Sequence, residues 1–135
     1  MNLINKILFV LPIFAMMGNA NAQITDPSKA FTLNAIKSID EVEITITPAN
    51  GFFLYKDKIH FFDGNSTNQL KIKNISGKSE LKKFPYAPSH HVYSTPVQFY
   101  IPKPSTQLLK IQYQGCSTDG VCLPPQIKYF KVTND

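Results

Sequence analysis

Hydrophobic and polar residues alternate along most of the chain from residue 31 onward. The apolar residues of each run stand at every second position, as Phe31, Leu33 and Ala35 do. Further runs with this spacing cover residues 42–46, 53–61, 70–72, 97–101, 109–113 and 127–132. A period of two is typical of β-strands that bury one face and expose the other. Only residues 29–39 also fit a helix, so the pattern predicts an all-β chain.

Clusters of turn-forming residues separate these runs. Pro, Gly, Asn, Asp and Ser gather at residues 48–51, 63–66, 76–77 and 102–105. About seven strands with turns roughly every 8–12 residues predict an immunoglobulin-like antiparallel β-sandwich, with a small barrel as the alternative. Residues 84–91 break the pattern, because Pro85 and Pro88 would interrupt the hydrogen bonds of a central strand. We therefore expect a stiff aromatic loop there.

The first 22 residues resemble a targeting sequence rather than part of the fold. Lys6 is the only charged side chain before an apolar run of about 11 residues, and Ala20-Asn21-Ala22 matches the cleavage pattern of a secretory signal peptide. The run is much shorter than the roughly 20 residues that span a bilayer, although an uncleaved anchoring helix is the alternative. We expect cleavage after Ala22, export, and one mature domain covering residues 23–135.

The charged residues exclude some classes of partner. The chain carries 14 basic residues, none of them arginine, and 9 acidic residues. Without the predicted signal peptide the net charge is about four positive units, too small and too evenly spread for a nucleic-acid-binding surface. Without arginine, bidentate recognition of phosphate or guanine is also excluded. We therefore expect no nucleic-acid partner.

Two cysteines near the C-terminus are the main candidates for chemistry. Cys116 and Cys122 lie between the predicted strands 108–114 and 126–132, with Asp119-Gly120 as the turn. They would therefore stand near the closed end of a hairpin. A disulfide across that end is reasonable if the two Cα atoms approach within about 4.4–6.8 Å.

Spacing alone favours a structural disulfide, but such a bridge would stabilise little. It closes a loop of about seven residues, which is worth roughly 2.4 kcal/mol, against about 4.7 kcal/mol for a 100-residue loop. A short bridge at an exposed hairpin end is also easily reached by an attacking thiolate, as thiol–disulfide exchange requires. Both interpretations stay open at this point.

Other uses of the cysteines have less support. His60, His90 and His91 supply further potential ligands, but no C-x-x-C or spaced histidine pair is typical of a zinc site. A cysteine hydrolase would need a nucleophile motif and an oxyanion loop, and neither is recognisable. We expect no metal and no cofactor, and we interpret the histidines of residues 84–91 as loop residues.

The cysteine segment resembles the amino-terminal periplasmic domain of the thiol:disulfide interchange protein DsbD. The similarity consists of Tyr-Gln-Gly before Cys116, five residues to Cys122, and Pro-Pro at 124–125. Residues 51–56 (Gly-Phe-Phe-Leu-Tyr-Lys) resemble the Gly-Tyr-Tyr-Leu-Tyr strand of that family, and Ala30-Phe31 and Val92-Tyr93 also fall where it has similar residues. The resemblance covers about residues 26–132.

This resemblance implies an immunoglobulin-like domain in the periplasm that carries electrons. Cys116 and Cys122 would cycle between dithiol and disulfide, and Cys122 would form the mixed disulfides. The electrons would come from a thioredoxin-like or membrane donor and pass to periplasmic thioredoxin-fold proteins, such as disulfide isomerases or cytochrome c maturation factors. Tyr86 matches the aromatic residue of a shielding cap loop, and Phe53 and Tyr55 match aromatic positions near the site. The chain would then be a component of a protein-disulfide reductase.

Two departures from the family change these expectations. Phe84-Pro85 precede Tyr86 where the family usually has acidic residues, so His90 or His91 would take part in tuning the cysteines. The chain ends at Asp135 without a membrane segment or a C-x-x-C module, so we expect a separate electron donor. The alternative function is a secreted β-sandwich that binds a partner and whose disulfide is purely structural.

Overall fold

The computed structural model describes residues 26–133 of the chain. The predicted signal peptide 1–22 and its cleavage site lie outside the described residues. Within residues 26–133, no helix is long and apolar enough to cross a membrane. Two short 3₁₀ turns, η1 (Pro27–Lys29) and η2 (Lys56–Lys58), accompany the strands.

Strands make up most of the described chain, as the alternating pattern predicts. They are β1 (Phe31–Lys37), β2 (Glu41–Pro48), β3 (Phe52–Tyr55), β4 (His60–Asp63), β5 (Asn74–Ser76), β6 (Glu80–Phe84), β7 (Ala87–Tyr93), β8 (Val97–Pro102), β9 (Leu108–Tyr113), β10 (Gly115–Ser117) and β11 (Gln126–Lys131). All paired strands run antiparallel and form sheets of order β1-β2-β8-β5, β10-β3-β7-β6 and β11-β9-β4. The antiparallel all-β prediction is confirmed, with more and shorter strands than expected.

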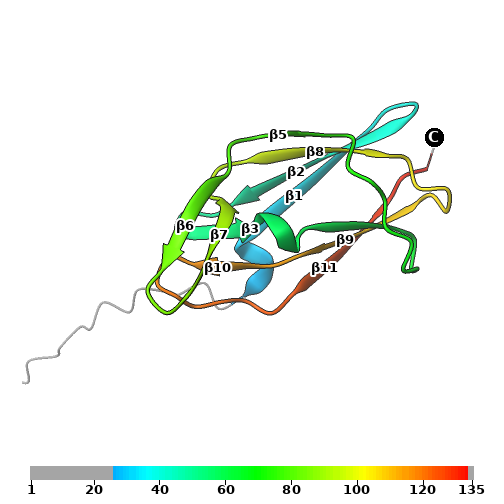
Figure 1. Cartoon of the computed structure of the whole chain (residues 1–135). Helices are drawn as coiled ribbons and strands as arrows, with labels where there is room; N and C mark the ends of the chain where they lie inside the picture. Colours follow the sequence, from blue (N-terminus) through cyan, green and yellow to red (C-terminus); the bar gives the residue numbers. More distant parts are fainter. Residues whose placement is uncertain (1–25, 134–135) are drawn as a thin grey trace, which may run out of the picture.

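The core lies between the β1-β2-β8-β5 sheet and the other two sheets (Figure 1). Alternate residues of β2, β8 and β9 are buried, in the order that the period of two predicts. Ile44, Phe99 and Ile111, one from each of these strands, are at most 1% exposed. Each such side chain stabilises the fold by roughly 1.5–3 kcal/mol on the transfer scale. This core holds in place the strands that carry the cysteine hairpin.

The apolar run 53–61 is one alternating segment in the sequence but two strands in the structure. The 3₁₀ turn η2 separates β3 from β4 and directs them into different sheets. The bend leaves Tyr55 at the end of β3 and places Asp57 just beyond it, in η2. Residues 70–72, which we expected to be a strand, lie outside the strands, with Leu70 and Ile72 packed on the core. The ambiguous segment 29–39 is mostly strand β1.

Residues 84–91 are part of a β-hairpin, which corrects the prediction of a stiff loop. Strands β6 and β7 pair antiparallel, and the hairpin reverses at Pro85-Tyr86. Pro88 lies where the register shifts, between the pairs Lys82↔His90 and Phe84↔Ala87. An irregularity of this kind tolerates a residue without an amide hydrogen. Moreover, β7 pairs with β3 only near its end, through Val92 and Tyr93, so Pro88 interrupts no bond on that side.

Candidate functional site

The two cysteines form a disulfide across the end of a hairpin, as expected. The amide of Ser117 donates to the carbonyl of Val121 (2.7 Å), and the amide of Leu123 donates to the carbonyl of Gly115 (3.0 Å). These bonds flank Cys116 and Cys122. The two cysteines therefore form a non-hydrogen-bonded pair, and in such a pair opposite side chains are closest. Their Cα atoms are 3.9 Å apart, closer than the range we expected, and the sulfurs are bonded.

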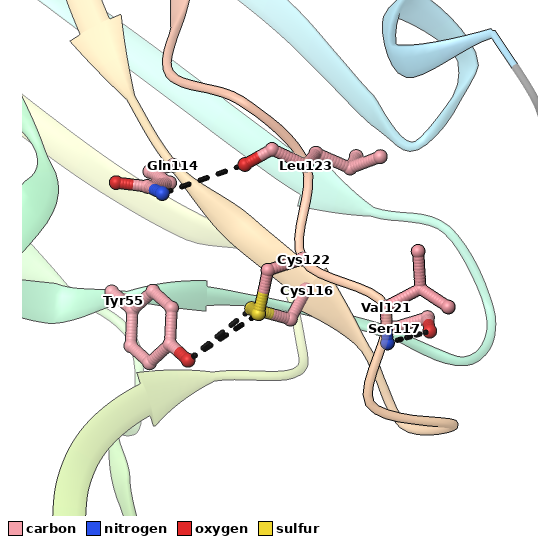
Figure 2. The surroundings of a disulfide bond; sticks show 7 residues. All are labelled: Tyr55, Gln114, Cys116, Ser117, Val121, Cys122 and Leu123. Atoms are coloured by element: carbon pink, nitrogen blue, oxygen red, sulfur yellow. Dashed lines mark hydrogen bonds between the residues drawn. A yellow bond between two sulfur atoms is a disulfide. The ribbon is translucent and has the colours of Figure 1, made fainter.

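The turn of this hairpin depends on a glycine. Gly120 has a φ of 88°, which L side chains rarely adopt, and its amide donates to the carbonyl of Ser117 (3.1 Å). The amide of Val121 also donates to the Ser117 hydroxyl (3.2 Å), and the side-chain amide of Gln114 donates to the carbonyl of Leu123 (3.4 Å) (Figure 2). The local sequence thus closes the hairpin independently of the disulfide.

A second glycine allows the cysteine strand to pack closely. Strand β10 pairs with β3, and Cys116 stands opposite Phe53. A Cβ atom on Gly115 would come within 2.2 Å of the carbonyl oxygen of Phe53 and 2.4 Å of the ring of Phe31. Only glycine therefore allows this approach, which explains why Gly precedes the first cysteine.

The two sulfur-bearing residues differ in exposure. Cys116 is 1% exposed, whereas Cys122 is an exposed residue. An incoming thiolate can therefore reach Cys122 far more easily than Cys116. Because of this difference in exposure, Cys122 is open to attack and Cys116 is shielded.

Aromatic side chains surround the buried cysteine. Phe53 and Val92 form a small cluster with Cys116, and Tyr55 and Phe84 pack against it. The Phe53 and Tyr55 rings are 5.6 Å apart and perpendicular, and the Phe84 ring lies 6.3 Å from Phe53 and 6.5 Å from Tyr55. Phe53 and Tyr55, both named from the sequence, thus lie at the disulfide.

The hydroxyl of Tyr55 points at the two sulfurs (Figure 2). Its oxygen is 3.2 Å from Sγ of Cys116 and 3.9 Å from Sγ of Cys122. Bridged sulfurs carry no proton, so the hydroxyl is the donor and favours Cys116. Burial, helped by the nearby carboxylate of Asp57, raises the pKa of Tyr55 above its ordinary value. The phenol therefore keeps its proton throughout the physiological range.

The side chain of Tyr86 does not pack over the sulfurs. Its side chain is fully exposed, with a relative accessibility of 101%, at the reversal of the β6–β7 hairpin. The expectation that Tyr86 covers the disulfide is therefore corrected. Phe84 of the same hairpin contacts the cluster instead, because side chains alternate along β6 and Phe84 shares the inner face with Lys82.

Lys82, Phe84 and His90 complete the site. The sequence did not predict where these three side chains lie. His90 lies 5.2 Å from the Tyr55 ring, 6.2 Å from the Phe84 ring, and its Nδ1 is 3.9 Å from a carboxylate oxygen of Asp57. The ammonium of Lys82 stands 4.5 Å from the centre of the Phe53 ring. The inward-facing residues of this hairpin stand at every second position within residues 80–93, as Lys82, Phe84 and His90 do. The two prolines obscured this signal in the sequence.

A cleft of about 470 Å³ adjoins this cluster. It is lined by Lys56, Asp57, Ser89, His90 and His91. Among the described residues, no group of three or more His, Cys, Asp or Glu side chains is placed to hold a metal ion.

His60 lies in a different environment from the other histidines. It belongs to β4, in the β11-β9-β4 sheet, and its Nδ1 lies 3.1 Å from the side-chain amide of Gln69.

Comparison with known proteins agrees with this geometry. The family described as "Thiol:disulfide interchange protein DsbD, N-terminal" matches residues 21–134. Curated relatives include the thiol:disulfide interchange protein DsbD of Campylobacter jejuni, 26% identical over 117 residues that make up 81% of this chain and 19% of the relative. The protein of the same name from Vibrio cholerae is 28% identical over 109 residues, which are 78% of this chain and 18% of that relative. This chain thus spans about a fifth of the length of these relatives.

Solved structures are similar over most of the chain. The reduced DsbD N-terminal domain of Neisseria meningitidis has 27% identity and a TM-score of 0.66, covering 83% of this chain and 91% of that one. A chain in the complex between the DsbD N-terminal and PilB N-terminal domains of the same organism has 26% identity and a TM-score of 0.64, covering 83% and 89%. The predicted immunoglobulin-like β-sandwich is confirmed. The chain belongs to the family of N-terminal domains of the thiol:disulfide interchange protein DsbD.

Proposed function

We propose that this protein carries reducing equivalents by thiol–disulfide exchange through Cys116 and Cys122. The observation that carries the proposal is the asymmetry of the disulfide: Cys122 is exposed, whereas Cys116 is buried and accepts a hydrogen bond from Tyr55. Exchange needs one sulfur that a thiolate can attack and one that leaves as a stabilised thiolate. A purely structural bridge needs neither.

The exchange begins with attack on the exposed sulfur. A thiolate of the donor attacks Sγ of Cys122, a bond forms between them, and the Cys116–Cys122 bond breaks. The electron pair of the broken bond leaves on Sγ of Cys116, where the Tyr55 hydroxyl stabilises the new thiolate. A second donor thiolate then attacks the mixed disulfide, which frees Cys122 and oxidises the donor. The domain has gained two electrons and, after protonation of its thiolates, two protons.

Delivery of the electrons reverses these steps. The Cys122 thiolate attacks the disulfide of an acceptor, and Cys116 then attacks the mixed disulfide and restores the bridge. The acceptor leaves as a dithiol. The same two residues thus receive and donate, with Cys122 as the sulfur that meets every partner.

The proposed partners are thioredoxin-fold proteins of the periplasm. Electrons would arrive from a thioredoxin-like or membrane donor and pass to acceptors of the disulfide isomerase or cytochrome c maturation type, so the protein acts as one component of a protein-disulfide reductase. Support comes from family membership and from the solved complex of a similar chain with a PilB N-terminal domain. Export to the periplasm would follow cleavage of the signal peptide after Ala22.

Trapping of mixed disulfides tests this function. The Cys116→Ser variant leaves Cys122 without its resolving partner, so it should accumulate covalent complexes with thioredoxin-fold proteins in periplasmic extract. Cys122→Ser is the matched control and should trap far fewer, because Cys116 is buried. If both variants trap equally little, the disulfide is structural and the alternative of a binding module takes its place.

A further inference from the structure

Lys82 is a cation held in place beside the disulfide. Its ammonium lies 4.5 Å from the centre of the Phe53 ring, and Phe53 is the direct neighbour of Cys116 across the β3–β10 pair. Lys82 is partly buried on the inner face of β6, opposite His90 of β7. The ring fixes the direction of a side chain that would otherwise move freely in solvent.

Within residues 26–133, no carboxylate forms an ion pair with the ammonium of Lys82. The ion pairs there join Lys73 to Glu41 and His90 to Asp57. Glu80, on the same strand as Lys82, accepts a hydrogen bond from the Ser94 hydroxyl (2.8 Å). Neither Glu80 nor Asp57 forms an ion pair with Lys82, so the ammonium of Lys82 remains available to a group from outside.

The surroundings of Lys82 carry charges of both signs, Glu80 on the same strand among them. Lys83 is the next residue and is exposed, and Lys56 lines the neighbouring cleft. Asp57 is the one acidic residue that lines the cleft, and it faces His90. Asp119 lies in the turn between the cysteines. A protein that approaches Cys122 from the side of the β6–β7 hairpin therefore meets the Lys82 ammonium as a cation that has no ion-pair partner among residues 26–133.

We propose that Lys82 selects exchange partners that carry a carboxylate beside their reactive cysteine. The inference rests on the proposed function and adds the chemical class of the partner surface. A carboxylate placed next to the attacking sulfur pairs with the fixed ammonium as that sulfur reaches Cys122. Complementary charges at such a contact raise the rate of encounter and disfavour partners of the wrong sign.

Small thiols of different charge test this selection on the oxidised protein. Mercaptoethanesulfonate is anionic, mercaptoethanol is neutral and cysteamine is cationic. The initial rate of mixed disulfide formation is measured by mass spectrometry after acid quenching, per thiolate present, and each charged thiol is expressed relative to mercaptoethanol. The variants are Lys82→Gln, Lys82→Arg and Lys128→Gln. Lys128 is the matched control, because it also stands over a ring, 5.7 Å from the centre of Phe130, but in the β11-β9-β4 sheet.

The wild-type protein should favour the anionic over the cationic thiol at low salt. Lys82→Gln should reduce this preference about twofold to fivefold, the effect of one charge at several ångströms in a watery setting. Lys82→Arg and Lys128→Gln should keep the preference. About 1 M salt should abolish it, since the screening length falls to roughly 3 Å.

A protein partner extends the same test. A thioredoxin-fold protein with acidic residues beside its C-x-x-C motif should exchange faster with the wild type than its lysine-substituted version does. Lys82→Glu should reverse that order, and a reversal supports the proposal.

Other results would overturn it. If Lys82→Gln keeps the thiol preference, or changes the rates of all three thiols equally, Lys82 does not discriminate partners by charge. Failure of the proposed function gives a different result, in which mercaptoethanol does not open the bridge and no thioredoxin-fold protein exchanges.

Discussion

At the scale of single residues, the distinctive contact is the one between a phenol and a sulfur. The Tyr55 hydroxyl, 3.2 Å from Sγ of Cys116, stabilises charge where the proposed exchange creates it. Tyr55 keeps this role across the physiological pH range, because burial raises its pKa. The residue thus connects the aromatic cluster to the chemistry of the disulfide.

Removal of that hydroxyl should slow exchange without unfolding the domain. We expect Tyr55→Phe to lower the rate of reduction by dithiothreitol about threefold to tenfold, which corresponds to the loss of one hydrogen bond worth about 1 kcal/mol. The ring and its packing on Phe53 remain. Tyr129→Phe is the control, because its hydroxyl lies 3.5 Å from the Asn65 side chain, in another sheet. Equal rates for wild type and Tyr55→Phe would remove the phenol from the mechanism.

A second residue, Asp63, makes stability depend on pH. Its carboxylate accepts hydrogen bonds from the backbone amides and hydroxyls of Ser105 and Thr106, at 2.6–3.0 Å. The side-chain and backbone bonds from these two residues hold the pKa of Asp63 well below its ordinary value. A depressed folded-state pKa means that the stabilisation is complete above the unfolded pKa of about 3.9 and is lost as pH falls further.

Asp63→Asn should therefore lower stability at neutral pH and weaken its decline in acid. We expect a loss on the order of 1 kcal/mol at pH 7, because solvent screens this partly exposed group. Urea denaturation between about pH 2 and pH 7 measures both effects. Asp40→Asn, a substitution at an exposed position, is the control. A variant with the same acid profile as the wild type would contradict the assignment.

At the scale of elements, the β3–β10 pair depends on a glycine. Gly115→Ala would place a methyl group within 2.2 Å of the Phe53 carbonyl and 2.4 Å of the Phe31 ring. We expect a loss of about 1–3 kcal/mol in the free energy of unfolding, as for other overpacked sites. Gly120→Ala is the comparison, since its methyl group meets nothing within 4 Å although its φ of 88° is strained. Denaturant titration should find Gly115→Ala the less stable of the two.

The β6–β7 hairpin limits access to the aromatic cluster through Phe84. Phe84→Ala should expose the rings of Phe53 and Tyr55 and speed reaction of the reduced protein with a neutral disulfide about twofold or more. Tyr86→Ala should have a much smaller effect, because the Tyr86 side chain is already fully exposed. If Tyr86→Ala gives the larger acceleration, the assignment of Phe84 is wrong.

The same hairpin shows where reasoning from sequence stops. The prolines at 85 and 88 argued against a strand, yet one lies in the turn and the other at a register shift, where neither interrupts a bond. The inner face of β6, with Lys82 and Phe84, therefore stayed hidden although its spacing was regular. A pattern of alternation does not reveal which strands pair, and pairing decides which prolines matter.

At the scale of the whole molecule, local signals predicted the frame and the disulfide. Alternation identified the core strands β2, β8 and β9, and the predicted strands on either side of the Asp119-Gly120 turn identified the hairpin that joins Cys116 to Cys122. The split of residues 53–61 between two sheets was not predictable, because a 3₁₀ turn of three residues leaves the period of two almost undisturbed. That split ends β3 at Tyr55 and so shapes the site.

From the position of the core, we expect the disulfide to open without loss of the fold. The main hydrophobic core lies between the sheets and contains neither cysteine: Cys116 belongs to a separate small cluster, and Cys122 is exposed. The hairpin that carries them is closed by its own backbone bonds. Reduction therefore removes only the modest contribution of a short loop, roughly 2.4 kcal/mol.

The reduction potential of the Cys116–Cys122 pair tests the central claim most directly. The purified domain is equilibrated with a thioredoxin of known potential, and the reduced fraction is read by alkylation and mass spectrometry. A working relay should equilibrate with thioredoxin and have a potential well above about −300 mV, the value below which structural disulfides usually fall. A potential far below that value would contradict the relay and identify the bridge as structural.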